Sequence, residues 1–521
     1  MNYLILVLLL VILWVALIYY LAPYLKKTKN FSPYGPALMI KLTRNRGILD
    51  KVSNKFPAKL FSRISVVLVL ASAVVAIFML AYGIYLGIGE LRTGVSSSGV
   101  PLTELIGLPG INPVIPIGFG TAALVFSVVI HEVFHGIVAR KHGITVKSVG
   151  ALFFIIPVGA FVEPDEKEIT EADPVVRRRI VAAGPGINVI IAFVSLALLI
   201  FLIAPSVHPV SLGGYVEQSS SHNIPISTGS EIISLGNYTG NSLNNLNSNS
   251  TLIPGKFYPS TYILDGKRHN TDIAAGVMIV STLTGFPAHN NLSVNGIIAG
   301  VDGHIIYNQT GLTDILNNVE PGRNVTITEV IIQNYSSQSS IVKNVTMPTV
   351  AKSVYYAKYD PSANQPDYKN QSFIGVTVEY AGLGIVPIQN VSSAITGRVI
   401  LSNPTSDFLS FLGLPFYGFS PVPSYLASLF SVPVSPLIFW GIMNSLYWLF
   451  WLNFLLGITN ALPFVVLDGG QFFRDTLIIG ERRKSLSFLK SDRVKNAISV
   501  LLNILVFVLL MGSVLLASHG V

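Results

Sequence analysis

Six stretches of this chain stay apolar for about 20 residues, the length at which a helix crosses the hydrocarbon core of a bilayer. They are Tyr3–Leu21, Ser65–Ile88, Gly118–Ala139, Ile180–Ala204, Pro436–Leu456 and Ala497–Ala517. Only 12% of the residues are charged, whereas soluble domains average about 25%. The sequence therefore predicts a polytopic α-helical membrane protein with about six transmembrane helices. No basic residue precedes the first stretch, which is longer than a signal-peptide core, so we expect a retained membrane anchor.

Lys and Arg cluster in three segments beside the apolar stretches, at 23–63, 140–179 and 472–495. Short loops rich in these residues stay in the cytoplasm, and all three do so if both chain ends lie outside. We therefore expect a multi-pass protein of the cell membrane. Residues 1–117 would hold the first spans and a basic cytoplasmic loop, and 476–521 a basic cytoplasmic segment and the last span. Because the net charge of +8 gathers beside the spans, no nucleic-acid partner is expected.

Residues 205–395 form a long block without a spanning segment, rich in Asn, Ser, Thr and Gly. The orientation of the basic loops places this block outside the cell. It contains nine N-x-S/T sequons, which begin at Asn237, Asn249, Asn291, Asn308, Asn324, Asn334, Asn344, Asn370 and Asn390. This density is typical of an exported, glycosylated surface. The alternative is that an Asn-rich segment forms such motifs by chance.

The exterior block repeats internally. The chain has 65 residues between Ile232 and Ile297, and 67 between Pro254 and Pro321. In each copy an apolar run is followed by a Gly turn and a later Pro-Gly pair. The second copy also predicts a short helix at Gly311–Asn317. This order indicates repeated strand–helix–strand units, and so an inserted α+β, β-rich exterior domain.

The second copy resembles PDZ domains in the run Asn295–Gly303, and the first copy resembles them more weakly. We therefore expect two tandem PDZ-like modules, at about 207–270 and 275–385. Modules of this kind bind an extended peptide or a C-terminus along a sheet edge. A generic β-rich exterior domain is the alternative.

Residues 396–433 are rich in aromatic side chains but are interrupted by Pro404, Pro415, Pro421 and Pro423. So many prolines prevent a spanning helix. We expect an interfacial or re-entrant segment near the outer membrane surface.

The motif His131-Glu132-Val133-Phe134-His135 lies near the end of the third apolar stretch. Two histidines four residues apart share one helix face and can bind one Zn²⁺. The Glu between them can act as general base for a water molecule. The chain has no cysteine, so any further metal ligand must be His, Asp or Glu. Ionisable groups at membrane depth are costly, which favours a functional role for this motif.

A catalytic zinc site needs a third protein ligand, and Asp468 is the best candidate. It follows the fifth apolar stretch, on the side where the predicted orientation places the two histidines. Pro463, Gly469 and Gly470 interrupt the helix there, which lets the Asp turn toward the bundle interior. The alternative is an interfacial Asp that caps a short helix at Gln471–Leu477.

Two amides lie near the depth of the predicted metal. Asn188 follows Gly184-Pro185 in the fourth apolar stretch, and Asn460 closely precedes Pro463. Either amide could polarise a scissile carbonyl or hold the substrate backbone. A hydrogen bond between helices is the alternative for both.

Residues 149–163 are apolar and rich in strand formers, but too short and too rich in Pro and Gly to span a membrane. They predict a membrane-dipping hairpin, whose edge can pair with an unfolded substrate segment. The alternative is a hydrophobic loop packed on the helices.

The order of these features resembles the site-2 protease family of intramembrane zinc metalloproteases. The features are HEVFH in a span, an apolar hairpin, G-P-x-x-N in the next span, a PDZ-like insertion and a later L-D-G. The resemblance covers a catalytic membrane core in two parts, 118–204 and 434–475. The family often reads N-P-x-P before L-D-G, whereas here Ala461 replaces the first Pro.

By this resemblance His131, His135 and Asp468 would bind one Zn²⁺, with Glu132 as general base. Asn188 and Asn460 would position the substrate. The implied reaction is hydrolysis of peptide bonds within or near transmembrane segments of other proteins, as in regulated intramembrane proteolysis. Transmembrane proteins and membrane lipids would be its partners.

Two other functions fit parts of the sequence. One is a non-catalytic, membrane-anchored PDZ scaffold or chaperone with a vestigial metal site, which the intact Glu132 and the three candidate ligands disfavour. The other is a metal or ion transporter, which is disfavoured because the first, second and sixth apolar stretches hold few polar residues.

Overall fold

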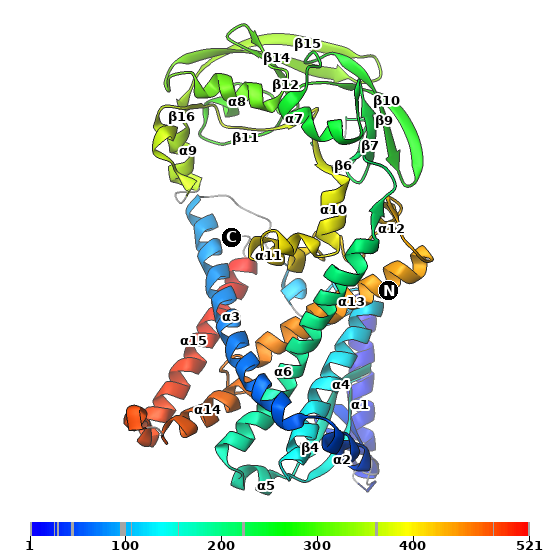
Figure 1. Ribbon diagram of the computed structural model, residues 1–521, viewed down its shortest axis with the longest axis vertical. Helices are drawn as coiled ribbons and strands as arrows, with labels where there is room; N and C mark the ends of the chain where they lie inside the picture. The colour runs from blue at the N-terminus through cyan, green and yellow to red at the C-terminus, as the bar shows by residue number, and fades with distance from the viewer. Residues whose placement is uncertain are drawn as a thin grey trace. The chain divides into compact units, whose positions relative to one another are not determined.

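The computed structural model describes residues 3–25, 27–28, 31–42, 46–93, 101–105, 107–154, 156–220, 224–359, 363–482 and 484–518 (Figure 1). The chain divides into two compact units. The first comprises Met1–Leu198 and Met443–Val521, and the second comprises Leu199–Ile442. The first unit is mainly helical and contains a four-stranded sheet, whereas the second contains two six-stranded sheets.

Five helices of the described residues are long and apolar enough to cross a membrane. They are α3 (Ala58–Thr93), α4 (Ile117–Lys141), α6 (Pro174–Leu198), α13 (Pro436–Asn460) and α15 (Asp492–Ser518). Each covers a predicted span, and the apolar helical stretch of α6 extends to Ser206. A further helix, α1 (Tyr3–Leu25), contributes only a shorter apolar segment, Val11–Leu25, to the described residues. The predicted number of about six spans therefore remains a prediction.

Helix α6 packs against several other helices of the first unit, because its buried face carries small residues. A side chain at Gly186 would collide with Ser65 of α3. A side chain at Gly457 of α13 would lie 2.8 Å from Val189 of α6. Small residues at such contacts let membrane helices approach closely. Short helices α2 (Arg46–Lys55), α5 (Glu166–Glu171) and α14 (Asp468–Gly480) complete the helical part of the unit.

The predicted hairpin is present in the first unit as the antiparallel strands β3 (Val146–Phe154) and β4 (Ile156–Pro164). It belongs to a larger sheet with the order β1-β2-β3-β4. The other two strands, β1 (Phe31–Tyr34) and β2 (Ala37–Leu42), lie in the basic segment 23–63, where the sequence analysis predicted no strand. Val162 of β4 packs with residues of α4 in one apolar cluster, so the sheet covers one side of the helix that carries the histidines.

The second unit contains two sheets with the same topology. Their strand orders are β10-β9-β7-β6-β19 and β15-β14-β12-β11-β18, and each has one further short strand at its third position. The repeated sequence runs become β7 (Glu231–Leu235) and β12 (Gly296–Val301), which occupy the same place in their sheets. The predicted short helix is α8 (Gln309–Asn317), and the Asn308 side chain caps it by accepting the N–H of Gly311.

The remaining strands of the two sheets have the following bounds. The first sheet contains β6 (Gly214–Ser219), β8 (Tyr238–Thr239), β9 (Phe257–Leu264), β10 (Lys267–Ala274) and β19 (Leu383–Pro387). The second contains β11 (Val277–Thr282), β13 (His304–Ile305), β14 (Asn324–Asn334), β15 (Ser339–Pro348) and β18 (Val376–Tyr380). Helix α7 (Leu246–Asn249) precedes β9, and α9 (Lys352–Tyr359) follows the short strand β16 (Val350–Ala351), which pairs with β17 (Ser372–Phe373).

The edge strands show that the two modules are nested. β18 completes the second sheet by pairing with β11, and after a tight turn β19 completes the first sheet by pairing with β6. The first module is therefore not continuous in sequence. Its last strand comes from the end of the range that the sequence analysis assigned to the second module, 275–385.

The segment 396–433 also belongs to the second unit. It forms two short helices, α11 (Ser406–Gly413) and α12 (Ser424–Ala427), after α10 (Ile388–Ile395). The following strand β20 (Phe430–Ser431) pairs with β5 (His208–Pro209), so the two ends of this unit's chain meet. The predicted interfacial position of the segment remains a prediction.

Candidate metal centre

Three of the predicted site residues come together in the first unit. Helix α4 carries His131 and His135 one turn apart, and Asp468 is the first residue of α14. The Nε2 atoms of His131 and His135 lie 3.0 Å and 3.3 Å from the same carboxylate oxygen, Oδ2 of Asp468. Among the described residues, these three form a group whose ligand atoms all lie within 4.8 Å of one another.

The donor atoms of this group fit a metal ion. Nδ1 of His135 lies 2.8 Å from the carbonyl oxygen of Ile180 on α6, so Nδ1 carries the proton and donates it. Nε2 of His135 then presents its lone pair to Oδ2 of Asp468. A lone pair and a carboxylate oxygen that face each other in this way can share a cation. Ligands about 2.0–2.2 Å from a tetrahedral zinc are separated by about 3.4 Å, close to the distances observed.

The chain around Asp468 fixes the direction of its carboxylate. Helix α13 ends at Asn460, and the following turn packs tightly against the start of α14. A side chain at Gly469 would collide with the carbonyl oxygens of Ala461 and Leu462. The N-cap of α14 is Leu467, which makes no side-chain cap. Asp468 is therefore not the helix cap that the alternative interpretation predicted, and its carboxylate meets the imidazoles instead.

Gly184 of α6 is a site residue that the sequence analysis placed only in the G-P-x-x-N motif. A Cβ atom at this position would collide with Nε2 of His135 and lie 2.5 Å from Nε2 of His131. Because Gly184 has no side chain, the space in which the two imidazoles and the Asp468 carboxylate meet stays open. In the sequence, the run of small residues Ala182–Gly184 within a span indicates a close approach of another helix. The run does not show which helix that is.

Glu132 lies between the two histidines and is half-buried. Its Oε2 accepts a hydrogen bond of 3.3 Å from the backbone N–H of Val162 on β4. The contact places β4 beside the predicted general base. In the sheet order β1-β2-β3-β4, β4 is an edge strand.

The two predicted substrate-positioning amides differ. Asn188 is fully buried one turn beyond Gly184 on α6, and neither its Oδ1 nor its Nδ2 has a hydrogen-bond partner among the described residues. Asn460 is half-buried and donates to the carbonyl oxygen of Leu456 in its own helix, at 3.0 Å. A buried amide without partners is rare in native proteins, and it marks Asn188 as the stronger candidate for contact with a ligand.

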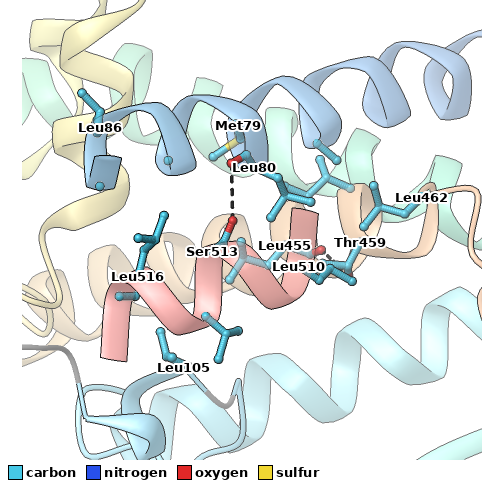
Figure 2. A pocket seen from close by; sticks show the side chains of 16 residues that line it. Met79, Leu80, Leu86, Leu105, Leu455, Thr459, Leu462, Leu510, Ser513 and Leu516 are labelled. Atoms are coloured by element: carbon cyan, nitrogen blue, oxygen red, sulfur yellow. Dashed lines mark hydrogen bonds between the residues drawn. The ribbon is translucent and has the colours of Figure 1, made fainter. Parts of the chain in front are cut away.

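An apolar cavity of about 530 Å³ lies between α3, α13 and α15 (Figure 2). Its walls include Leu80 and Leu86 of α3, Leu510 of α15 and Leu455 near the end of α13, and it extends to Leu462 in the turn before Asp468. The cavity has few polar atoms. The Ser513 hydroxyl on α15 donates to the carbonyl oxygen of Leu80 at 3.4 Å.

Ion pairs join the three basic segments of the sequence. Arg140 pairs with Asp50 at 2.5 Å, and Arg482 pairs with Asp173 at 2.9 Å. These contacts place the segments 23–63, 140–179 and 472–495 at one end of the first unit.

Comparison with known proteins identifies the class. Residues 119–509 match the model of peptidase family M50, and the chain therefore belongs to this metalloprotease family, the site-2 proteases. The resemblance inferred from the sequence motifs is confirmed. The chain is also 33% identical, over 194 residues, to an uncharacterized protein of Methanocaldococcus jannaschii. This match covers 37% of the chain and 51% of the relative, so the chain spans about half the length of that relative.

Proposed function

We propose that the protein is an intramembrane zinc metalloprotease that hydrolyses peptide bonds within or near transmembrane segments of other membrane proteins. The observation that carries the proposal is that Asp468 meets His131 and His135, which lie on a helix long and apolar enough to span a membrane. Glu132 on the same helix supplies the remaining group that hydrolysis requires.

The side chains divide the chemistry among them. His131, His135 and Asp468 would hold the ion, and bound zinc polarises a carbonyl oxygen and acidifies water. Glu132 would accept the proton of the attacking water and later deliver it to the leaving amine. The free amide of Asn188 would donate to the substrate backbone or to the oxygen on which charge develops.

The edge strand β4 is the proposed docking site for the segment to be cleaved. A helical peptide bond is shielded by its own hydrogen bonds, so the substrate must first unwind. An extended segment that adds to the outer edge of β4 gains replacement hydrogen bonds. The contact between Val162 and Glu132 supports this site, because the added segment would lie beside the general base.

The apolar cavity between α3 and α15 is the proposed entrance for a transmembrane segment. Of the described side chains of α15, only Val506 is buried, so most of the surface of this helix is not covered by the rest of the unit. Movement of α15 away from α3 would open the cavity toward lipid. The extension of the cavity to Leu462 supports a path toward the turn before Asp468.

The exterior unit is proposed to select substrates, as in regulated proteolysis that follows a first cut. In the second sheet β18 is an edge strand beside α8, an arrangement suited to an extended peptide or a new C-terminus. The proposed orientation puts this unit outside the cell and the metal centre toward the cytoplasm. This orientation is supported by the position of the three basic segments, which lie together at one end of the first unit.

The test is cleavage of a membrane-spanning segment by the purified full-length protein in detergent or nanodiscs. Glu132→Gln keeps the shape of the side chain but removes the base. We expect this variant to bind one zinc per chain like the wild type and to lose cleavage by at least about 10²-fold. Zinc is measured by elemental analysis, and cleavage by gel and mass spectrometry.

Two further measurements decide between the functions considered. Removal of zinc with a chelator should abolish cleavage, and added zinc should restore it. Full cleavage by Glu132→Gln with zinc still bound would refute the assigned base. A wild-type protein without stoichiometric zinc would favour a non-catalytic scaffold.

A further inference from the structure

A buried ion pair joins the two helices that flank the metal centre. The guanidinium of Arg177, in the first turn of α6, donates through Nε and Nη2 to Oδ1 of Asp475 on α14, at 3.0 Å and 2.7 Å. Asp475 is fully buried. Its other oxygen, Oδ2, accepts from Gln471 at 3.1 Å.

The same guanidinium is anchored to the chain before α6. Nη1 of Arg177 donates to the carbonyl oxygens of Thr170 and Ala172, at 3.0 Å and 3.1 Å. The guanidinium is therefore bound both to Asp475 and to the chain before α6. It cannot move with α14 if α14 slides along its axis. On α14, the next buried residue toward the metal centre is Phe472, whose ring lies 5.9 Å from the guanidinium carbon of Arg178.

The ion pair and the metal centre lie at matching levels of α6 and α14. Along α6, Arg177 precedes Gly184 by seven residues, and along α14, Asp475 follows Asp468 by seven. Gly184 adjoins the two imidazoles that Asp468 contacts. Seven residues are about two helical turns, so the contacts at both levels fall on the facing sides of two antiparallel helices.

We propose that the Arg177–Asp475 pair is a positioning device that fixes the axial register of α14, so that Asp468 reaches the two histidines. The inference rests on the proposed metal function. A slip of one turn would move Asp468 by about 5.4 Å, more than its distances of 3.0 Å and 3.3 Å to the imidazoles. Apolar contacts and small residues tolerate such a slip, whereas a buried ion pair does not. Setting register is the best-attested use of such pairs.

The decisive variant replaces both partners, Arg177→Met with Asp475→Leu, in the full-length protein. Exchange of a buried ion pair for apolar residues usually preserves folding stability. We expect the thermal midpoint of the metal-free protein to stay near that of the wild type. The zinc dissociation constant should rise by about 10- to 100-fold, the range typical for loss of a group that orients a ligand. A competing chromogenic chelator measures it.

A spectroscopic signature separates positioning from general stability. With Co²⁺ in place of zinc, the visible absorption bands depend on the number and geometry of the ligands. Their position and intensity should change in the double variant, whereas a merely structural pair would leave the bands of the folded protein unaltered. If the double variant does not fold, the single variant Arg177→Lys takes its place. This variant keeps the positive charge but loses the planar guanidinium, and it should shift the same absorption bands.

A second ion pair, which lies just outside the ends of α6 and α14, provides a matched control. Arg482, after α14, pairs with Asp173, before α6, at 2.9 Å, but both side chains are about half exposed. Arg482→Gln should leave zinc affinity and the cobalt spectrum unchanged, because the exposed pair sets no register. Wild-type zinc affinity and spectrum in the double variant, or in Arg177→Lys if the double variant does not fold, would overturn the inference. So would an equal effect of Arg482→Gln. Failure of the wild type to bind zinc would instead refute the proposed function.

Discussion

Gly184 shows how little space the metal centre leaves for its neighbours. Because α6 passes directly over the imidazoles, the site depends on a residue that contributes no atoms to it. The sequence motifs singled out His131, His135 and Asp468, because metal ligands need particular residue types at particular spacings. The structure places these three side chains together, and their role as metal ligands stays a prediction. The motifs could not predict the role of Gly184. That role depends on how closely α6 packs against α4, which the sequence alone does not show.

Gly184→Ala should destroy the metal centre. The added methyl group would occupy the space around both Nε2 atoms and force α6 away from α4. We expect loss of stoichiometric zinc and of cleavage, measured by elemental analysis and by the cleavage assay. Gly118→Ala in α4 is the control, because a Cβ there meets nothing within 4 Å, and it should bind zinc normally. Normal zinc binding by Gly184→Ala would show that the helices are not so close.

Asn188 and Asn460 make a second matched pair of residues. Asn188→Ala removes a buried amide that has no partner among the described residues, so folding stability should stay equal or rise. If the amide serves the reaction, the cleavage rate should fall by about 10²- to 10³-fold. Asn460→Ala should change the rate little, because that amide is bonded within its own helix. Thermal unfolding and initial rates measure both effects, and a wild-type rate in Asn188→Ala would assign this residue to packing alone.

At the scale of elements, hydropathy predicted the positions of the five long helices because burial in lipid leaves a long, uninterrupted sequence signal. The small sheet was predicted only in part. The hairpin β3–β4 is local and apolar, whereas β2 pairs with β3 across a large sequence separation, as in Leu38 with Phe153. Short strands whose pairing partner is distant have little signature of their own, since strand propensity depends on context. Strand β2 was missed for this reason, and with it β1, which pairs with β2.

A reversible cross-link between α3 and α15 should control access of substrate. A Cβ at Gly87 would lie 3.1 Å from Cβ of Leu516, so the helices need to separate by a few tenths of an ångström to reach the Cβ–Cβ range of about 3.5–4.5 Å in disulfides. The chain has no cysteine, so the double variant Gly87→Cys with Leu516→Cys can form only this bond within one chain. We expect the oxidised protein to keep its zinc but to cleave a transmembrane substrate slowly, and reductant to restore the rate.

Each single-cysteine variant, treated with the same oxidant, is the control for the cross-link. Unchanged cleavage by the fully oxidised double variant would exclude the cavity between α3 and α15 as the entrance.

At the scale of the whole molecule, the sequence predicted a membrane unit with a β-rich insertion and the internal repeat of that insertion. It did not predict the nesting of the modules, because sequence similarity identifies β7 and β12 as counterparts but carries no information on which sheet β18 and β19 join. Two adjacent strands of similar length can complete either sheet, and only side-chain packing decides between them.

The absence of cysteine also allows the proposed orientation to be tested with single labels. Ser336, between β14 and β15, is exposed, and the Lys167 side chain in α5 is 83% exposed. Ser336→Cys should react with a membrane-impermeant maleimide in intact cells. Lys167→Cys should react only after the membrane is permeabilised. Labelling of both positions in intact cells, or the reverse order, would contradict an exterior insertion and a cytoplasmic metal centre.

Because the second module is inserted before β19, the first sheet is completed late during synthesis of the chain. A ribosome delivers the N-terminal strands first, so β6 emerges long before β19, which pairs with its outer edge. The second sheet gains its last strand, β18, immediately before the first sheet gains β19. Until then the nascent chain keeps an open edge at β6, which invites pairing with other chains. A translational arrest anywhere between these strands would leave a half-built β-rich insertion with an exposed strand edge, which favours aggregation.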